Sequence, residues 1–94
     1  QKAAVCTGSG KSMIPDALAK GAQVYVTGDI DHHTGIDAVA AGLPIIDAGH
    51  YGIEHVFIKY IAGYIGRECP GVDIVTADIC SPFEVVFNPD RMEN

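Results

Sequence analysis

The chain has 94 residues, of which 48% are apolar and 19% charged, a composition typical of one folded globular domain rather than a disordered chain. Six Lys and Arg residues against 12 Asp and Glu residues give a net charge of −6, which repels phosphate backbones and argues against nucleic acid as a partner. No apolar run approaches the roughly 18 residues of a membrane span. We therefore expect one domain over residues 1–94 and no membrane partner.

The three cysteines, Cys6, Cys69 and Cys80, form no Cys-x-x-Cys pair. An odd number at irregular spacing predicts buried thiols in a reducing compartment rather than a disulfide framework or a zinc site. This favours a cytoplasmic location.

Short apolar runs alternate with helix-compatible stretches, which predicts βαβ units around a parallel sheet. In chain order we expect a strand at 3–7, a helix at 11–20, a strand at 23–27, a helix at 33–41, a strand at 43–47, a helix at 51–69, and strands at 72–77 and 83–87. The predicted fold is α/β, with a mainly parallel sheet, helices on both faces, and the order βαβαβα followed by two further strands. The aromatic residues Tyr25, Tyr60 and Tyr64 are interpreted as core or interface residues.

The polar residues that follow the first three strands are candidates for chemistry, because ligands bind at the carboxyl ends of strands in open α/β sheets. The first loop, Gly8 to Ser12, ends in Gly-Lys-Ser like a phosphate-binding loop. The motif requires a glycine five positions before Gly10, where this chain has Val5. A tight strand-to-helix turn is the simpler interpretation, and a nucleotide-binding loop that depends on Lys11 is a minor alternative.

The second loop places Asp29, Asp31, His32 and His33 within five residues. Imidazole and carboxylate groups together suit a transition metal or an acid–base pair. Adjacent side chains point apart, so His32 and His33 should not both face one site. Asp31 is explained equally well as the N-cap of the following helix.

The third loop carries His50 and Glu54, which their i, i+4 spacing brings to one face of a helix that opens at Tyr51. This pair is half of a zinc, manganese or iron site, since stable sites normally take roughly three or four protein ligands. The structural alternative is that His50 caps the helix while Glu54 interacts with the positive end of its dipole. His55 points off the shared face and is expected at the surface.

The run at residues 21–30, which includes Thr-Gly-Asp-Ile, is followed by His33, by Asp37 and Ala38, and by Asp-Ala-Gly-His-Tyr at residues 47–51 with Glu54. This combination resembles the C-terminal half of the Nif-three-like family, also labelled GTP cyclohydrolase I type 2 homologue. The resemblance covers nearly the whole chain. It implies an α/β fold, a homohexamer in the full-length form, and a dinuclear site for divalent zinc, manganese or iron.

The resemblance also implies that His50 and Glu54 are metal ligands. The remaining ligands, a pair of adjacent histidines and an aspartate, belong to the N-terminal half of the family pattern, and His32–His33 is not that pair because it lies in the Thr-Gly-Asp-Ile loop. Asp29 and His33 match pocket residues and are the candidate acid/base groups. Family members are considerably longer, so we expect this chain to be a C-terminal part whose N-terminal segment was removed, was left out of an isolated domain, or is a separate chain.

The function implied by the resemblance is that of a metal-dependent hydrolase-like protein, in which two metal ions activate water against a small, nucleotide-like substrate. The sequence does not decide whether the protein is an enzyme, and GTP itself carries little weight as the substrate. The alternative is a non-enzymatic metal-binding regulatory or scaffold protein that forms a homo-oligomeric ring.

Overall fold

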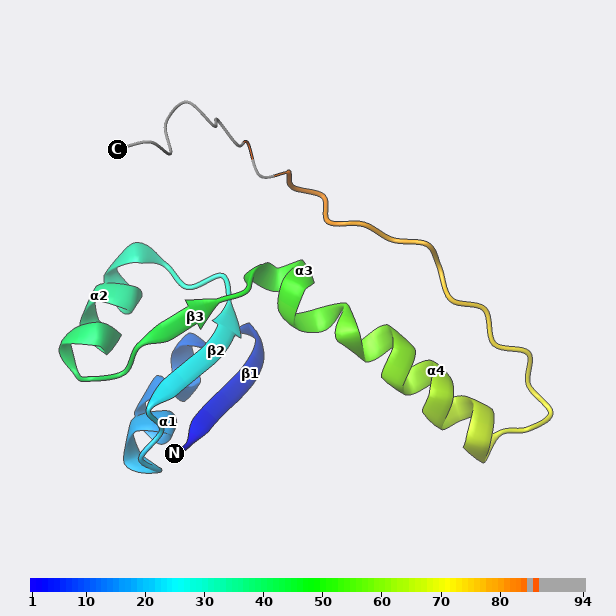
Figure 1. Ribbon diagram of the computed structural model, residues 1–94, viewed down its shortest axis with the longest axis horizontal. Coiled ribbons are helices and arrows are strands. Elements are labelled where there is room, and N and C mark those ends of the chain that lie inside the picture. Colours follow the sequence, from blue (N-terminus) through cyan, green and yellow to red (C-terminus); the bar gives the residue numbers. More distant parts are fainter. Residues whose placement is uncertain (85, 87–94) are drawn as a thin grey trace.

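The computed structural model describes residues 1–84 and residue 86. It contains a three-stranded parallel sheet in the order β1-β2-β3 with helices after each strand (Figure 1). This arrangement confirms the predicted α/β fold with a parallel sheet. The elements are β1 (Ala3–Ser9), the 3-10 turn η1 (Gly10–Met13), α1 (Ile14–Ala19), β2 (Val24–Gly28), α2 (His32–Ala40), β3 (Ile45–Asp47), α3 (Gly49–Glu54) and α4 (Val56–Glu68).

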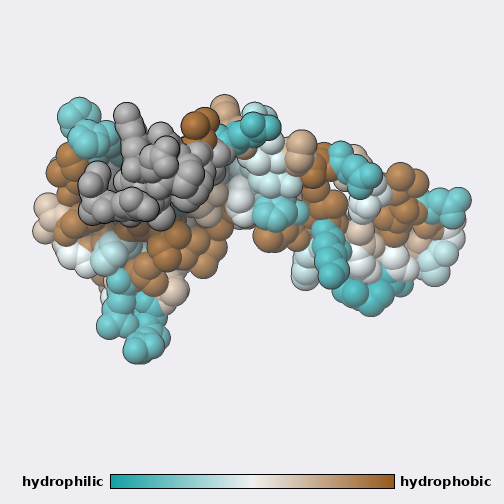
Figure 2. Space-filling model, turned by 45° about the horizontal axis from the view of Figure 1, so that its top comes forward, coloured by the Kyte–Doolittle hydropathy of each residue, from teal (hydrophilic) through white to brown (hydrophobic). Residues whose placement is uncertain are grey.

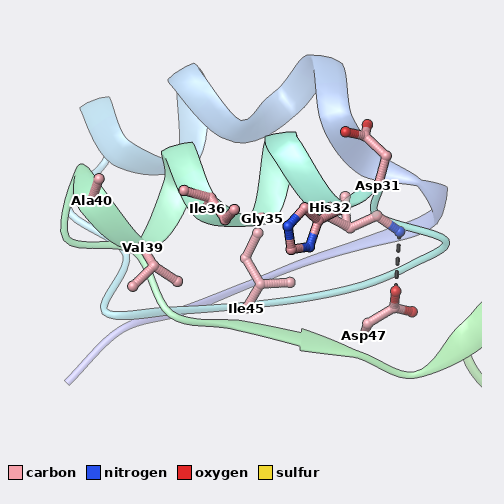
Figure 3. Close-up of a pocket in the computed structure, with 9 residues that line it drawn as sticks. Asp31, His32, Gly35, Ile36, Val39, Ala40, Ile45 and Asp47 are labelled. Atoms are coloured by element: carbon pink, nitrogen blue, oxygen red, sulfur yellow. Dashed lines mark hydrogen bonds between the residues drawn. The ribbon is translucent and has the colours of Figure 1, made fainter.

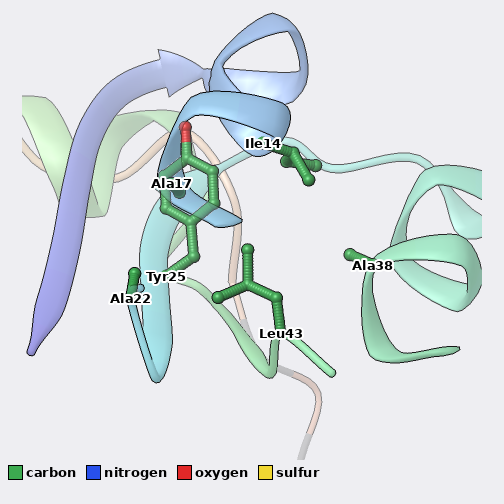
Figure 4. Close-up of a cluster of buried hydrophobic side chains, with 6 residues drawn as sticks. All are labelled: Ile14, Ala17, Ala22, Tyr25, Ala38 and Leu43. Atoms are coloured by element: carbon green, nitrogen blue, oxygen red, sulfur yellow. The ribbon is translucent and has the colours of Figure 1, made fainter. Parts of the chain in front are cut away.

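The hydrophobic core lies between one face of the sheet and the helices α1 and α2 (Figure 4). Tyr25 from β2 is 1% exposed, and Leu43, just before β3, is completely buried. Tyr25 lies opposite Ala4 and Ile45 in the strand register, so these three side chains share the covered face. The buried hydrophobic residues are Ile14, Ala17, Ala22, Tyr25, Ala38 and Leu43.

The second face of the sheet is less covered than predicted. Val26 lies opposite Val5 and Ile46 in the register, so these three residues share the other face. Val5 is 65% exposed and Ile46 is 54% exposed. Within the described residues, α1 and α2 therefore bury one face of the sheet, and the apolar side chains of the other remain accessible.

Glycines end the first two helices, as the sequence predicts. Gly21 and Gly42 have φ values of 76° and 91°, in the left-handed region that glycine adopts without steric cost. The N–H of Leu43 then bonds to the carbonyl of Ala38, and the carbonyl of Pro44 accepts the N–H of Tyr25. Strand β3 therefore begins only at Ile45, two residues later than predicted, because Leu43 is still part of the helix-ending turn.

The predicted helix at 51–69 is two helices with a break at His55. The His55 ring stacks on Tyr51 at a centroid distance of 4.7 Å, and its Nδ1 lies 2.9 Å from the carbonyl oxygen of Tyr51. The backbone N–H of His55 bonds to the same carbonyl. An i to i+3 bond follows from the N–H of Ile58 to the carbonyl of His55, which marks a tightened turn at the junction.

Helix α4 extends away from the sheet, and the following residues run back along it (Figure 1). Residues 69–84 contain no helix or strand, so the strand predicted at 72–77 is absent there. A strand requires a neighbour for its backbone groups, and the sheet has none at this position. The second predicted strand, 83–87, includes residues that lie outside the described ones.

Two further expectations concern the surface. The three cysteine thiols are free, as predicted, but only Cys6 is partly buried, whereas Cys69 and Cys80 are exposed because they lie after α4 and beyond the core. Within the described part of the chain, no helix is both long enough and apolar enough to cross a membrane.

Candidate metal centre

The carboxyl end of β1 is fixed by two buried side chains of β2. The hydroxyl of Thr27 accepts the N–H of Gly10 at 2.9 Å and donates to the carbonyl of Gly8 at 3.0 Å. The hydroxyl of Tyr25 donates to the carbonyl of Gly10 at 2.7 Å, and burial raises the pKa of Tyr25 to about 12. These bonds hold Gly8 beside the ends of the neighbouring strands.

Asp47, the last residue of β3, organises the loops that carry the candidate site. Its carboxylate accepts the backbone N–H groups of Asp29, Ile30 and Gly49 at 3.0, 3.0 and 2.9 Å. These bonds lower the pKa of Asp47, and the bond from Gly49 has the largest effect. Two residues in this region have left-handed backbones, Asp29 with φ 52° and Gly49 with φ 72°. Asp47 therefore ties the β2 and β3 loops together.

The sequence patterns assign no role to Asp47. An aspartate two residues before a glycine is a known signal for a side-chain bond to the backbone, and this signal accounts for the contact with Gly49. The bonds to Asp29 and Ile30 cross 18 and 17 residues of sequence, a separation that no local pattern reveals.

The predicted residues Asp29, His50 and Glu54 lie together. Nδ1 of His50 is 2.7 Å from Oδ2 of Asp29, and Nε2 of His50 is 3.1 Å from Oε1 of Glu54. All three side chains are roughly half exposed. The hydrogen bond with Asp29, followed by the negative charge of Glu54, raises the pKa of His50.

The chemistry of this cluster follows from the two ring nitrogens of His50. A carboxylate only accepts hydrogen bonds, so Nδ1 carries a proton and donates it to Asp29. In the neutral ring, Nε2 then has a lone pair that faces the lone pairs of Glu54 Oε1. This contact favours a cation between the two atoms, which can be a proton or a metal ion.

Gly8 leaves space beside this pair. A Cβ atom at Gly8 would lie 3.4 Å from Oε1 of Glu54 and 3.7 Å from Cε1 of His50, and the φ of Gly8 is 68°. A similar close approach occurs at Gly28, where a Cβ would lie 2.7 Å from the carbonyl oxygen of Gly49. Glycines at these two strand ends therefore let the third loop approach the first two.

His33 does not join this cluster. It is exposed in the first turn of α2, where its ring packs edge-on against His32 at a centroid distance of 5.7 Å.

Asp31 is the N-cap of α2, as the structural interpretation predicts. Its carboxylate accepts hydrogen bonds from the N–H and the hydroxyl of Thr34 at 2.9 and 2.6 Å. Bonds with Thr34 lower the pKa of Asp31 to about 2.

The first loop is held as a turn. The N–H of Gly10 is already bonded to Thr27, and Nζ of Lys11 lies 3.5 Å from Asp31. This geometry favours the turn over the phosphate-loop alternative.

Among the described residues, no group of three or more His, Cys, Asp or Glu side chains is arranged to hold a metal ion. The donors that converge are His50 and Glu54, with Asp29 on the opposite ring nitrogen.

The chain is an α/β protein whose parallel sheet carries glycine-rich turns and a carboxylate–histidine–carboxylate cluster at the carboxyl ends of its strands. The model of the Duf34/NIF3 (NGG1p interacting factor 3) family matches residues 1–82. The chain belongs to this family.

Similar curated proteins share the same label. The chain is 50% identical over 66 residues to a protein of Streptococcus pneumoniae and 49% identical over 71 residues to a protein of Lactococcus lactis, both called GTP cyclohydrolase 1 type 2 homolog. The matches cover 70% and 76% of this chain but 24% and 27% of those proteins. The chain thus spans about a quarter of the length of these relatives.

Solved structures agree with this assignment. A Bacillus cereus protein related to NIF3 matches with a TM-score of 0.69 and 34% identity, over 89% of this chain and 24% of that one. Reduced HcgD from Methanocaldococcus jannaschii matches with a TM-score of 0.59 and 36% identity, over 69% of this chain and 27% of that one.

Proposed function

We propose that His50 and Glu54 supply one nitrogen and one oxygen ligand of a divalent-metal centre in a metal-dependent hydrolase-like protein. One observation carries this proposal: Nε2 of His50 lies 3.1 Å from Oε1 of Glu54 while Asp29 occupies Nδ1. A carboxylate on the far nitrogen of a metal-binding histidine fixes the ring orientation and makes the near nitrogen a better donor. Asp29 is then a positioning residue for His50.

The donor set suits zinc, manganese or iron, because imidazole and carboxylate bind all three. Two ligands fall short of the roughly three or four that hold a metal firmly. Since the chain spans about a quarter of its relatives' length, we infer that further ligands for a two-metal site come from outside it, in a full-length homo-oligomer. When bound, the metals supply Lewis-acid activation of substrate and water.

Asp29 and His33 stand as the acid/base candidates, and Asp29 would act by way of the His50 ring that it positions. Asp29 reaches the reacting region only through His50, to which its carboxylate is bonded at 2.7 Å. His33 is exposed and separate from the cluster, so it acts only if the bound substrate extends to the first turn of α2. We propose a small, nucleotide-like substrate. The relatives' name, GTP cyclohydrolase 1 type 2 homolog, supports an enzyme over the ring-forming scaffold.

Metal content tests the ligand assignment. We would measure it by plasma mass spectrometry on this chain and on a chimera in which the chain replaces its equivalent in the Lactococcus lactis relative. We expect metal in the chimera, lost by His50→Ala and by Glu54→Ala. His55→Ala is the matched control, because His55 is a neighbouring exposed histidine bonded to Tyr51. Unchanged metal content in both ligand variants would overturn the assignment.

Activity tests the enzymatic part separately. A screen of phosphate and cyclic-amide hydrolysis on small nucleotide-like substrates should give a turnover in the metal-loaded chimera that His50→Ala abolishes. A metal-loaded chimera without turnover, whose ring assembly survives His50→Ala, would instead support the scaffold.

A further inference from the structure

Two carboxylates compete for the one ring proton of neutral His50. Oδ2 of Asp29 lies 2.7 Å from Nδ1, and Oε1 of Glu54 lies 3.1 Å from Nε2. A neutral imidazole carries its proton on one nitrogen, and the other nitrogen keeps the lone pair that binds a metal ion. Metal binding at Nε2 therefore requires the tautomer whose proton, on Nδ1, is donated to Asp29.

Asp29 reaches His50 from a backbone conformation that has to be held in place. Its φ is 52°, and among the described residues it is the one non-glycine with a positive φ. Aspartate enters the left-handed region more readily than most residues, yet still at a cost in free energy that surrounding contacts have to offset. The position of the Asp29 carboxylate thus depends on what binds the backbone of its loop.

The carboxylate of Asp47 provides these contacts. Its Oδ1 accepts the N–H of Asp29 at 3.0 Å and the N–H of Gly49 at 2.9 Å. Its Oδ2 accepts the N–H of Ile30 at 3.0 Å, a bond that joins the end of β3 to the loop before α2 (Figure 3). Gly49 directly precedes His50 in the chain. One oxygen atom therefore anchors the backbone on both sides of the bond between Asp29 and His50.

The two backbones that are joined in this way are also in direct contact. A Cβ atom on Gly28 would lie 2.7 Å from the carbonyl oxygen of Gly49 and 3.2 Å from the backbone nitrogen of His50. The N–H of Ala48 donates to the carbonyl of Thr27 at 2.8 Å. The distance from carboxylate to ring nitrogen therefore depends on how the loop after β2 meets the start of α3, and not on α3 alone.

We propose that Asp47 selects the tautomer of His50 that carries its proton on Nδ1 and presents a lone pair at Nε2. The hydrogen bonds of Asp47 go to backbone N–H groups, so it acts through Asp29 as a positioning residue. When Asp47 is removed, the Asp29 loop relaxes and its carboxylate leaves Nδ1. The ring then loses that proton to water and gains one at Nε2, where Glu54 accepts the hydrogen bond.

Long-range nitrogen NMR of His50 in the metal-free chain measures the tautomer, at a pH high enough to keep the ring neutral. We expect the Nδ1–H form in the unmodified chain. Asp47→Asn keeps one oxygen but turns an amide group toward an N–H donor, so it should give a mixture of tautomers. Asp47→Ala removes all three bonds and should give mainly the Nε2–H form.

Asp31→Asn is the matched control. Asp31 also accepts a backbone N–H in the loop before α2, but its partner is Thr34 and not a residue of the cluster. We expect this variant to keep the Nδ1–H form. Asp47→Asn is the milder of the two Asp47 variants, and its dispersed amide resonances report that it is folded. An unchanged tautomer in folded Asp47→Asn, or the same shift in Asp31→Asn, would overturn the proposal.

Zinc titration of the same chains tests the consequence for the metal site, which rests on the proposed function. We expect Asp47→Asn to weaken zinc binding by about tenfold, the lower end of the range for residues behind a metal ligand. Because Asp47 acts through Asp29, the double variant should bind zinc no more weakly than Asp29→Asn alone. Two losses that multiply would overturn action through Asp29.

The two readouts separate the two hypotheses. Zinc that leaves the Nε2 resonance of His50 unchanged, in a chain whose tautomer still responds to Asp47→Asn, would overturn the ligand assignment and support the role of Asp47. Zinc binding at Nε2 that persists in Asp47→Asn with an unchanged tautomer would support the ligand assignment and overturn the role of Asp47.

Discussion

The sheet region, residues 3–48, and the arm formed by α4 differ in how they bury apolar side chains. Among the described residues, every buried hydrophobic side chain belongs to the first region, between Ile14 and Leu43. Helix α4 buries none, and Phe57, Tyr60 and Tyr64 lie exposed on it. The arm at the right of Figure 2 shows this hydrophobic surface.

This difference shows that the two regions are stabilised by different means. The sheet region has a local core and a network of buried hydrogen bonds at its strand ends. The arm has an amphipathic pattern, and its apolar side chains are left unburied by the described residues. The candidate metal ligands lie on α3, which contacts β1 and β2, so they are positioned by the first region.

The largest effect should come from the core. Leu43→Ala removes a completely buried side chain and should lower the free energy of unfolding by about 2–5 kcal/mol. Urea unfolding followed by circular dichroism measures this. Ile79→Ala, at a half-exposed position after α4, should change stability by about 0.5 kcal/mol or less. Similar losses in both variants would break the contrast between the two regions.

The next effect tests the buried hydrogen bonds at the strand ends. Thr27→Val keeps the shape of the side chain but leaves the N–H of Gly10 and the carbonyl of Gly8 without their partner. We expect a loss of about 1–3 kcal/mol in the same unfolding assay. Thr34→Val is the control, because the hydroxyl of Thr34 bonds to Asp31 at the surface. A neutral Thr27→Val variant would mean that the turn does not depend on this bond.

Asp47 should make the sheet region sensitive to acid. Its pKa is lower in the folded chain than the ordinary value of 3.8. The ionised carboxylate therefore stabilises the fold fully at a pH above this ordinary pKa. This stabilisation is lost as the pH falls through the folded pKa. Asp47→Asn should therefore be less stable at neutral pH and show a shallower decline in acid. Unfolding curves across this range compare the two, and parallel declines would exclude the role given to Asp47.

The smallest effect is expected on the arm. Tyr60 is 66% exposed on α4, so Tyr60→Ser should change the unfolding free energy of this chain by about 0.5 kcal/mol or less. A larger loss, seen by chemical denaturation of the isolated chain, would show that α4 is already covered in solution.

The local sequence predicts the elements of the sheet region well. The alternation of apolar runs with glycine-ended helices places β1 and β2 to within about two residues, and Asp31 is recognised as an N-cap. The break at His55 is missed because it depends on a side-chain contact with Tyr51 inside an otherwise continuous helical pattern. The strand at 72–77 is predicted from composition, but composition carries no information about where its neighbour is.

The candidate site is predicted only in part for the same reason. The i, i+4 spacing brings His50 and Glu54 together along one helix. The contact between Asp29 and His50 spans 21 residues, and it forms because Asp47 fixes the Asp29 loop in a left-handed conformation. Long-range polar contacts of this kind arise from the folded sheet edge. The family resemblance named these residues, but only the fold shows that Asp29 holds His50.

The most direct test of the central claim is the nitrogen NMR spectrum of His50 during titration of this chain with zinc. We expect zinc to shift the Nε2 resonance of His50 while Nδ1 keeps its proton, and Asp29→Asn to weaken zinc binding by about 10- to 100-fold. A zinc-induced change at Nδ1, or at His32 and His33 in place of His50, would contradict the ligand assignment.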